Sequence, residues 1–448
     1  MNSASAIRRR PAERGTSAPD VIGLCRDLIR LPSVGQRDGE AAVVGHLATL
    51  LTRMSTAAVE VIEPAPGRPS LLCTVPGRGP GPTLLLNGHA DTVLEGPGWT
   101  RNPYGAECDG GRIHGLGASD MKGGVAALVC ATVAVAAAGG PAAGTLVLAV
   151  TADEDAGMQW GVPWLAAHGR LQADAAIVAE AAGSTADFDR LALASRGYGY
   201  VEIEITTPAR AHASRYDPAA PHAVAVAADL IGALERAFRP SPRVHPLYPT
   251  GPTVVAGYEI NGGQALGRLP ERARFSVGVR LLPGGDRTTL MRELTAFVHA
   301  RTGDASARIT PVSVSPFAEG MELEPGHPLV ELASAAVAAA GYPTPAVAGM
   351  SGFSEGAFLA ARGIPTLPAL GPGRAPLERT PPGCTGRCRA TANPTMGSER
   401  LSSPEGMFMV SPHGTEADAW PIALALMPTS STDPPVLCSH QKQLDVPC

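Results

Sequence analysis

The residues best suited to chemistry in this sequence are one histidine and six acids at the ends of expected secondary-structure elements. They are His89 and Asp91 after "TLLLNG", Asp120 in "GLGASDMKGG" before a long apolar run, Asp153, Glu154 and Asp155 after "LVLAVTA", and Glu180 after "AAIVA". Ligands bind at the carboxyl ends of strands in an open α/β sheet, so these side chains are expected to meet at one edge. Singly, each has an ordinary explanation as a loop histidine, a solvated acid or a helix cap. Together they favour a divalent-metal site.

Helix and strand patterns alternate from Pro19 to about Phe188, and these elements must position the site. Apolar residues at helical spacing predict helices at 19–31, 40–54 and 123–139, and continuous apolar runs predict strands at 83–88, 144–152 and 175–180. This alternation predicts an α/β fold whose catalytic domain has a mixed, mainly parallel sheet covered by helices on both faces.

The middle of the chain has a different pattern. In "YVEIEIT" the residues Val201, Ile203 and Ile205 share one strand face, and "ARFSVGVRLL" alternates in the same way. Such strands belong to a sheet with one face in water, and nearby helical stretches predict a smaller inserted α+β unit. The expected division is a flexible leader at 1–18, a catalytic domain at 19–189, a lid and dimerisation domain at 190–307, the rest of the catalytic domain at 308–373, and an atypical tail at 374–448.

Bulk composition narrows the class of protein. A chain of 448 residues exceeds what one core usually supports, so two domains are expected. The formal charge of −5 and the lack of a Lys/Arg-rich face argue against nucleic-acid binding. No apolar segment of secretory length follows the basic start, and the apolar run from Val125 is too short to cross a bilayer. We therefore expect a cytoplasmic protein that does not span a membrane and acts on small molecules.

Three motifs together resemble a known enzyme family. "NGHADTV", "GWTRNPYGAECDGGRIHGLGASDMKGG" and "TADEDAG", followed by the strand-end Glu180, are similar to the acetylornithine deacetylase, succinyl-diaminopimelate desuccinylase, carboxypeptidase G and aminoacylase family of co-catalytic metallohydrolases. The similarity runs from about Asp20 to Gly373. It implies a two-metal site in which a metal-activated water cleaves an amide bond.

The resemblance assigns a role to each site residue. It implies His89, Asp120 and Glu180 on one metal, with Asp120 shared with a second metal that Asp155 also binds. Glu154 would be the general base, and Asp91 would orient the imidazole of His89. Mostly oxygen ligands with imidazole favour Zn²⁺, with Co²⁺ or Mn²⁺ as substitutes.

The same resemblance extends to the inserted unit. Arg196, His212 and Arg280 fall where relatives carry substrate-contacting groups, and the lid histidine would steady the oxyanion in the partner of a homodimer. Arg280 would bind a substrate carboxylate. Alternatively, Arg280 is one of several solvated charges on its strand face, together with Arg272 and Arg274.

The chain departs from the family pattern in several places. Asp155 stands where Glu is usual, Gly267 where Asn is usual and Glu355 where Asp is usual. The largest departure follows Gly373, where the family supplies a metal-binding His and a last helix. Here the segment lacks periodicity; His413 with Glu416 could fill the place, or the coding frame has shifted. Cys384 and Cys388 with Cys438 and Cys448 fit a loose tail better than a zinc site.

We therefore expect a metal-dependent amidohydrolase that removes the acyl group from an N-acyl amino acid. The first alternative is a dipeptidase or carboxypeptidase of the same family. A catalytically impaired metal-binding relative is the second, because of the missing His. A serine hydrolase using Ser354 in "GFSEG" is a third, and its partners would be Asp433 and His440.

Overall fold

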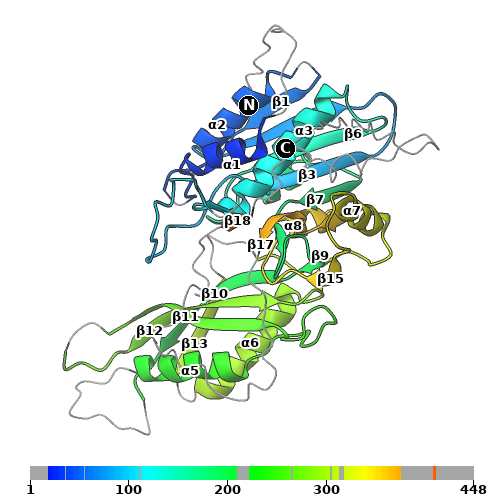
Figure 1. Ribbon diagram of the computed structural model, residues 1–448. Helices are drawn as coiled ribbons and strands as arrows, with labels where there is room; N and C mark the ends of the chain where they lie inside the picture. Colours follow the sequence, from blue (N-terminus) through cyan, green and yellow to red (C-terminus); the bar gives the residue numbers. More distant parts are fainter. Residues whose placement is uncertain are drawn as a thin grey trace, which may run out of the picture.

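The architecture is that of a computed structural model, which describes residues 19–35, 37–54, 56–109, 112–208, 221–263, 266–302, 305–311, 317–374 and 407–409. Two hydrophobic cores account for most of the buried apolar residues, one in each of the two parts visible in Figure 1. His212 and His413, both named above, lie outside the described residues.

The larger part is built on a six-stranded mixed sheet. Its order is β1 (Ala58–Ile62), β2 (Ser70–Pro76), β6 (Thr145–Thr151), β3 (Thr83–His89), β7 (Ala175–Val178) and β16 (Thr366–Leu367). The last four strands run parallel to one another, whereas β2 is antiparallel to both of its neighbours. Parallel β6, β3 and β7 therefore end at the same edge.

Helices cover both faces of this sheet, as predicted. One face packs against α1 (Val21–Ile29), α2 (Ala41–Leu51) and α3 (Gly123–Ala137), with α7 (Pro328–Ala339) in the same core. The other face packs against α4 (Val162–Ala167) and α8 (Gly356–Ala360). Neighbouring residues of β3 point to opposite sides of the sheet, so Leu86 lies in the core of the larger part and Leu85 in a separate apolar cluster on the face covered by α4 and α8. Burial on both faces explains the continuous apolar strand sequences.

The long apolar helix is preceded by a further helical turn. A π-helical turn, η1 (Ala118–Lys122), continues into α3, and the segment Ala118–Ala137 is long and apolar enough to cross a membrane by length and composition. The apolar run from Val125 itself lies within α3 (Gly123–Ala137), and the backbone of η1 is non-helical at Asp120 and Met121. In addition, 83% of the most apolar window of Ala118–Ala137 is buried inside the protein, as in the core helix of a globular fold.

The smaller part is an antiparallel sheet with helices on one face. Its order is β11 (Thr253–Gly262), β12 (Arg272–Leu281), β10 (Gly197–Thr206) and β13 (Ser306–Pro311), and α5 (Ala223–Ala237) and α6 (Arg287–Thr302) pack against it. Val201, Ile203 and Ile205 face the helices, while Glu204 on the other face pairs with Arg274 at 3.0 Å. The predicted α/β class with an inserted α+β unit is confirmed.

Short strands complete the structure between and around the two sheets. β9 (Arg190–Ser195) pairs with β14 (Met321–Glu322) and β15 (Ala346–Gly349), β8 (Ala181–Gly183) pairs with β17 (Gly371–Arg374), and β5 (Arg112–His114) pairs with β4 (Glu107–Asp109) and β18 (Met407–Met409). Leu191 and Leu193 of β9 belong to the larger core, although residue 190 was the expected start of the inserted unit. The exact domain limits stay a prediction.

Candidate metal centre

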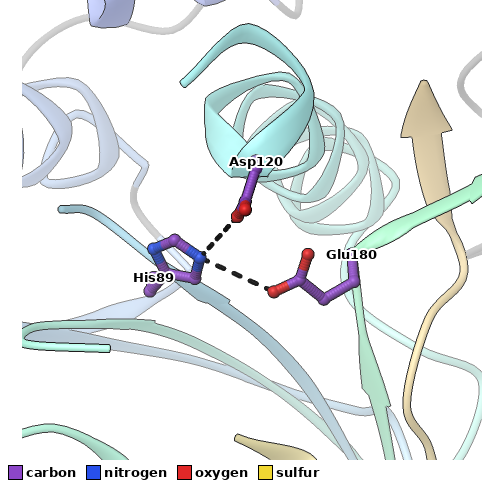
Figure 2. Close-up of side chains that lie close together, drawn as sticks. All are labelled: His89, Asp120 and Glu180. Carbon is purple, nitrogen blue, oxygen red and sulfur yellow. Dashed lines mark hydrogen bonds and ion pairs between the residues drawn. The ribbon is translucent and has the colours of Figure 1, made fainter. Parts of the chain in front are cut away.

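His89 is the centre of a cluster of acids at the edge where the parallel strands end. It is the last residue of β3, and its ring is fully buried. Its Nε2 lies 3.0 Å from Oδ1 of Asp120 and 3.6 Å from Oε1 of Glu180, so two carboxylates point at one nitrogen (Figure 2). The side chain of Asp120 is 63% exposed, which leaves the cluster open to solvent on that side.

The topology of the sheet brings these residues together. β3 and β7 are parallel neighbours, so His89 and Glu180 leave the sheet at the same edge. Asp120 arrives from η1, and α3 begins close to the same edge because Gly124 lets it approach: a Cβ there would collide with the carbonyl oxygen of Ala179. Gly88 leaves equivalent room for the side chain of Met121. The Gly-rich motif therefore serves close packing.

A second group of donors shares the same histidine. Atoms of His89, Glu154 and Asp155 lie within 4.8 Å of one another, as do those of His89, Asp120 and Glu180. The two groups thus overlap at His89. The predicted sharing of Asp120 between two ions stays a prediction.

Asp91 connects His89 to the loop of residues 152–155 that follows β6 (Thr145–Thr151), called here the acidic loop. The Nδ1 of His89 lies 3.1 Å from the backbone oxygen of Asp91 and 3.5 Å from its Oδ1. The Asp91 carboxylate also accepts hydrogen bonds from the backbone amides of Glu154, at 3.1 Å, and Asp155, at 2.9 Å. Asp91 therefore holds the loop as well as the ring.

Hydrogen-bond chemistry at His89 calls for a positive charge. A carbonyl oxygen can only accept, so Nδ1 carries the proton that it donates to Asp91. In a neutral ring, Nε2 would then present a lone pair to the oxygens of Asp120 and Glu180. A proton or a metal ion between these atoms removes that repulsion. Accordingly, although burial alone would lower the pKa of His89, hydrogen bonds with Asp120, Asp91 and Glu180 raise it well above its ordinary value.

The pKa values of the surrounding acids are also raised, and a bound cation would lower them again. Burial, with the nearby charge of Asp120, raises the pKa of Glu180 to about 7. Burial is also the largest cause that raises the pKa values of Glu154 and Asp155, and repulsion from neighbouring carboxylates raises them further. One imidazole and crowded carboxylate oxygens form a donor set that fits a divalent transition metal.

Glu355, noted above as a departure from the family, lies in a buried polar network beneath the cluster. Both of its carboxyl oxygens are 3.0 Å from Oγ1 of Thr151, and Thr151 is also 3.3 Å from Nδ2 of Asn87. Burial raises the pKa of Glu355 to about 7. The longer side chain is therefore accommodated inside the protein.

Lys122 is a structural residue that the sequence reading left without a role. Its ammonium is buried and donates to the carbonyl oxygens of Leu28, at 2.9 Å, and Leu31, at 2.8 Å. These contacts tie the turn that carries Asp120 to the end of α1. A lone lysine at the start of an apolar helix is a signal that could have pointed to such an anchor.

The two arginines predicted to bind the substrate, Arg196 and Arg280, lie in different surroundings. Arg196 is buried, and its guanidinium donates to the carbonyl oxygen of Gly251 at 2.7 Å and to Oγ1 of Thr250 at 3.2 Å. Arg280 is half-buried, lies 5.0 Å from the ring centre of Tyr198, and forms no ion pair with a described residue. Within the described part of the chain, Arg280 is therefore the better placed of the two to bind an anion.

Ser354 does not have the surroundings of a nucleophile. Its hydroxyl is buried, donates to the carbonyl oxygen of Pro368 at 2.9 Å and accepts from the amide of Gly356 at 3.2 Å. Its expected partners, Asp433 and His440, lie outside the described residues. The observed contacts give Ser354 a structural role.

Known proteins resemble this chain in sequence and in fold. The model of peptidase family M20/M25/M40 matches residues 85–382. A succinyl-diaminopimelate desuccinylase from Rhodospirillum centenum is 35% identical over 187 residues, which cover 40% of this chain and 48% of that protein. Another, from Methylobacterium nodulans, is 29% identical over 357 residues, covering 77% of this chain and 86% of that one.

A solved structure shares the fold over nearly the whole chain. The dipeptidase Dug1p from Saccharomyces cerevisiae aligns with a TM-score of 0.68 at 15% identity, covering 91% of this chain and 95% of that one. The chain spans about half the length of the first curated relatives that it matches. These similarities therefore show the fold and the family but not a particular substrate.

Metal binding can be measured without any assay of activity. We expect Zn²⁺ at 100 times its dissociation constant to stabilise the protein by about 2.7 kcal/mol, visible as a rise in melting temperature. His89→Ala should abolish most of this rise, because both donor groups include His89. His46→Ala, on α2, is the matched control and should keep it. An equal rise in His89→Ala would place the ion elsewhere.

Proposed function

Because the chain belongs to peptidase family M20/M25/M40, we propose that it is a metal-dependent hydrolase that cleaves the amide bond of an N-acyl amino acid. The observation that carries this proposal is the geometry at Nε2 of His89, where the oxygens of Asp120 and Glu180 converge at 3.0 and 3.6 Å. Such an arrangement is suited to holding a cation at an open edge of the sheet.

The residues that would hold metal are those of the two overlapping groups. His89, Asp120 and Glu180 would bind one ion, and Asp155 would bind a second that shares Asp120. When bound, Zn²⁺ lowers the pKa of a water molecule and polarises the scissile carbonyl. Co²⁺ or Mn²⁺ are the proposed substitutes.

Glu154 is the proposed proton carrier. Its backbone amide is fixed by Asp91, and its carboxyl group lies beside the donors of His89 and Asp155. Burial raises the pKa of Glu154, which favours a group that takes a proton and then gives it to the leaving amine. Asp91 orients His89 and the loop that carries Glu154.

Two classes of substrate are consistent with the relatives. N-acyl amino acids, with an N-succinyl or N-acetyl group, are proposed first because the curated relatives named above are succinyl-diaminopimelate desuccinylases. A dipeptide is the alternative, because Dug1p is described as a dipeptidase. Both carry a carboxylate, which Arg280 would bind.

The role of Glu154 is tested by an isosteric change. Glu154→Gln removes the proton carrier and keeps the proposed metal ligands, so the turnover number should fall about 10²- to 10⁴-fold. Metal content, measured on the purified protein by mass spectrometry, should stay at the wild-type value. A variant that hydrolyses its substrate at the wild-type rate would exclude this role.

The proposed binding of the substrate carboxylate by Arg280 is tested on a panel of N-succinyl, N-acetyl and dipeptide substrates. Loss of a charge-assisted hydrogen bond in Arg280→Gln should raise KM about 10- to 100-fold. Arg274→Gln is the control, because Arg274 lies on the same strand face but pairs with Glu204. If both variants have the wild-type KM, Arg280 does not bind the substrate.

We also propose a homodimer through the inserted unit. β11 is an edge strand of its sheet, and the exposed fractions of Tyr258 and Ile260 are 57% and 56%. Apolar residues exposed on an edge strand favour pairing with another chain.

Light scattering during size-exclusion chromatography tests the dimer. The wild type should elute at twice the chain mass, and Ile260→Lys should shift it toward the monomer because a charge would be buried at the interface. Val244→Lys is the control, since Val244 is 83% exposed in the loop before β11. A monomeric wild type would disprove the dimer.

A further inference from the structure

The backbone of the acidic loop is held at four consecutive amides by side chains from other parts of the chain. The amide of Ala152 donates to Oγ of Ser70 at 3.1 Å, and that of Asp153 donates to Oε1 of Glu40 at 3.2 Å. The next two amides donate to Asp91, as described above. From the sequence, Asp91 was expected to orient His89, and none of these four amide contacts was predicted.

Glu40 is an unusual residue for such a contact because its carboxylate is costly to bury. Its side chain is inaccessible, and its Oε1 accepts from Nη1 of Arg68 at 2.7 Å. Its Oε2 is buried and has no hydrogen-bond partner among the described residues. Burial raises the pKa of Glu40 to about 7. A buried ion pair with an unsatisfied oxygen is weak support for stability alone.

The side chain of Glu40 serves the loop and not its own helix. Glu40 is the N-cap residue of α2, yet its side chain makes no capping hydrogen bond there. Arg68, which holds it, also donates to the carbonyl oxygen of Gly35 and lies 4.0 Å from Oδ1 of Asp153. Glu40 and Arg68 therefore form a clamp on Asp153.

Asp153 is the residue of the loop that most needs support. Its φ is +68°, a left-handed conformation that few residues other than glycine adopt. Its Oδ2 accepts from the amides of Gln159, at 2.8 Å, and Trp160, at 3.2 Å. Contacts on both sides of Asp153 hold the turn, and Glu154 follows directly.

We propose that Glu40, held by Arg68, is a positioning residue for catalysis: by accepting the amide of Asp153, it fixes the direction in which Glu154 leaves the backbone. This inference rests on the proposed role of Glu154 as proton carrier. Among the described residues, the side chain of Glu40 contacts Arg68 and the amide of Asp153 and none of the proposed metal ligands. Its removal should therefore affect the chemical step more than substrate binding.

Kinetics of three variants separate positioning from general stability. Glu40→Ala should lower kcat about 10- to 100-fold, in the range seen for residues that orient active groups, with KM within about threefold of wild type. Glu40→Gln keeps an oxygen that can accept from Asp153, so it should recover most of this loss. Glu60→Ala, which breaks the exposed pair of Glu60 with Arg170, is the control and should leave kcat unchanged.

Hydrogen–deuterium exchange tests the clamp without any substrate. The amides of residues 153–155 should exchange faster in Glu40→Ala than in the wild type, Glu40→Gln or Glu60→Ala, at a temperature where all four are folded. Faster exchange together with a lower kcat supports the proposal. Unchanged exchange, a KM effect in place of a kcat effect, or equal losses in Glu40→Ala and Glu40→Gln would overturn it.

The same experiment separates this inference from the proposed function. If the wild type hydrolyses none of the panel substrates, the proposed function fails and the catalytic role of Glu40 is overturned with it. Exchange would still show whether the clamp on Asp153 exists, because it does not depend on turnover. An active wild type with unchanged exchange in Glu40→Ala would contradict the clamp alone.

Discussion

The dominant physical constraint on this structure is the gathering of negative charge around one buried imidazole. His89 donates through Nδ1 to a carbonyl and faces two carboxylates through Nε2, with two further acids close by. Bringing so many acids into a partly desolvated site costs free energy unless a positive charge joins them. A bound cation would offset that cost, which is the physical basis of the proposed metal site.

The remainder of the larger part serves to hold this arrangement in place. Parallel strands deliver His89 and Glu180 to one edge, and Gly124 lets the helix after Asp120 approach that edge. Buried polar side chains then fix the connecting backbone, with Lys122 at the turn that carries Asp120 and Glu40 at the acidic loop. Such rigid support reduces the reorganisation that catalysis would otherwise require.

Local pattern was sufficient to predict the elements and the candidate ligands. Apolar runs marked β3, β6 and β7, and the polar residues directly after them marked the site, because strand ends of a parallel sheet meet at one edge. The same reasoning could not find Glu40, whose partner lies 113 residues away along the chain. Nor could it show that Arg196 is engaged by Thr250 and Gly251, because that contact depends on how a distant loop folds back.

Anomalous diffraction from crystals grown with Zn²⁺ would locate the ion itself. We expect a peak between His89, Asp120 and Glu180, about 2.0–2.2 Å from Nε2 and from the carboxylate oxygens. This peak should disappear in crystals of His89→Ala. A wild-type crystal with no anomalous peak at these residues, or with zinc bound only elsewhere, would contradict a metal site around His89.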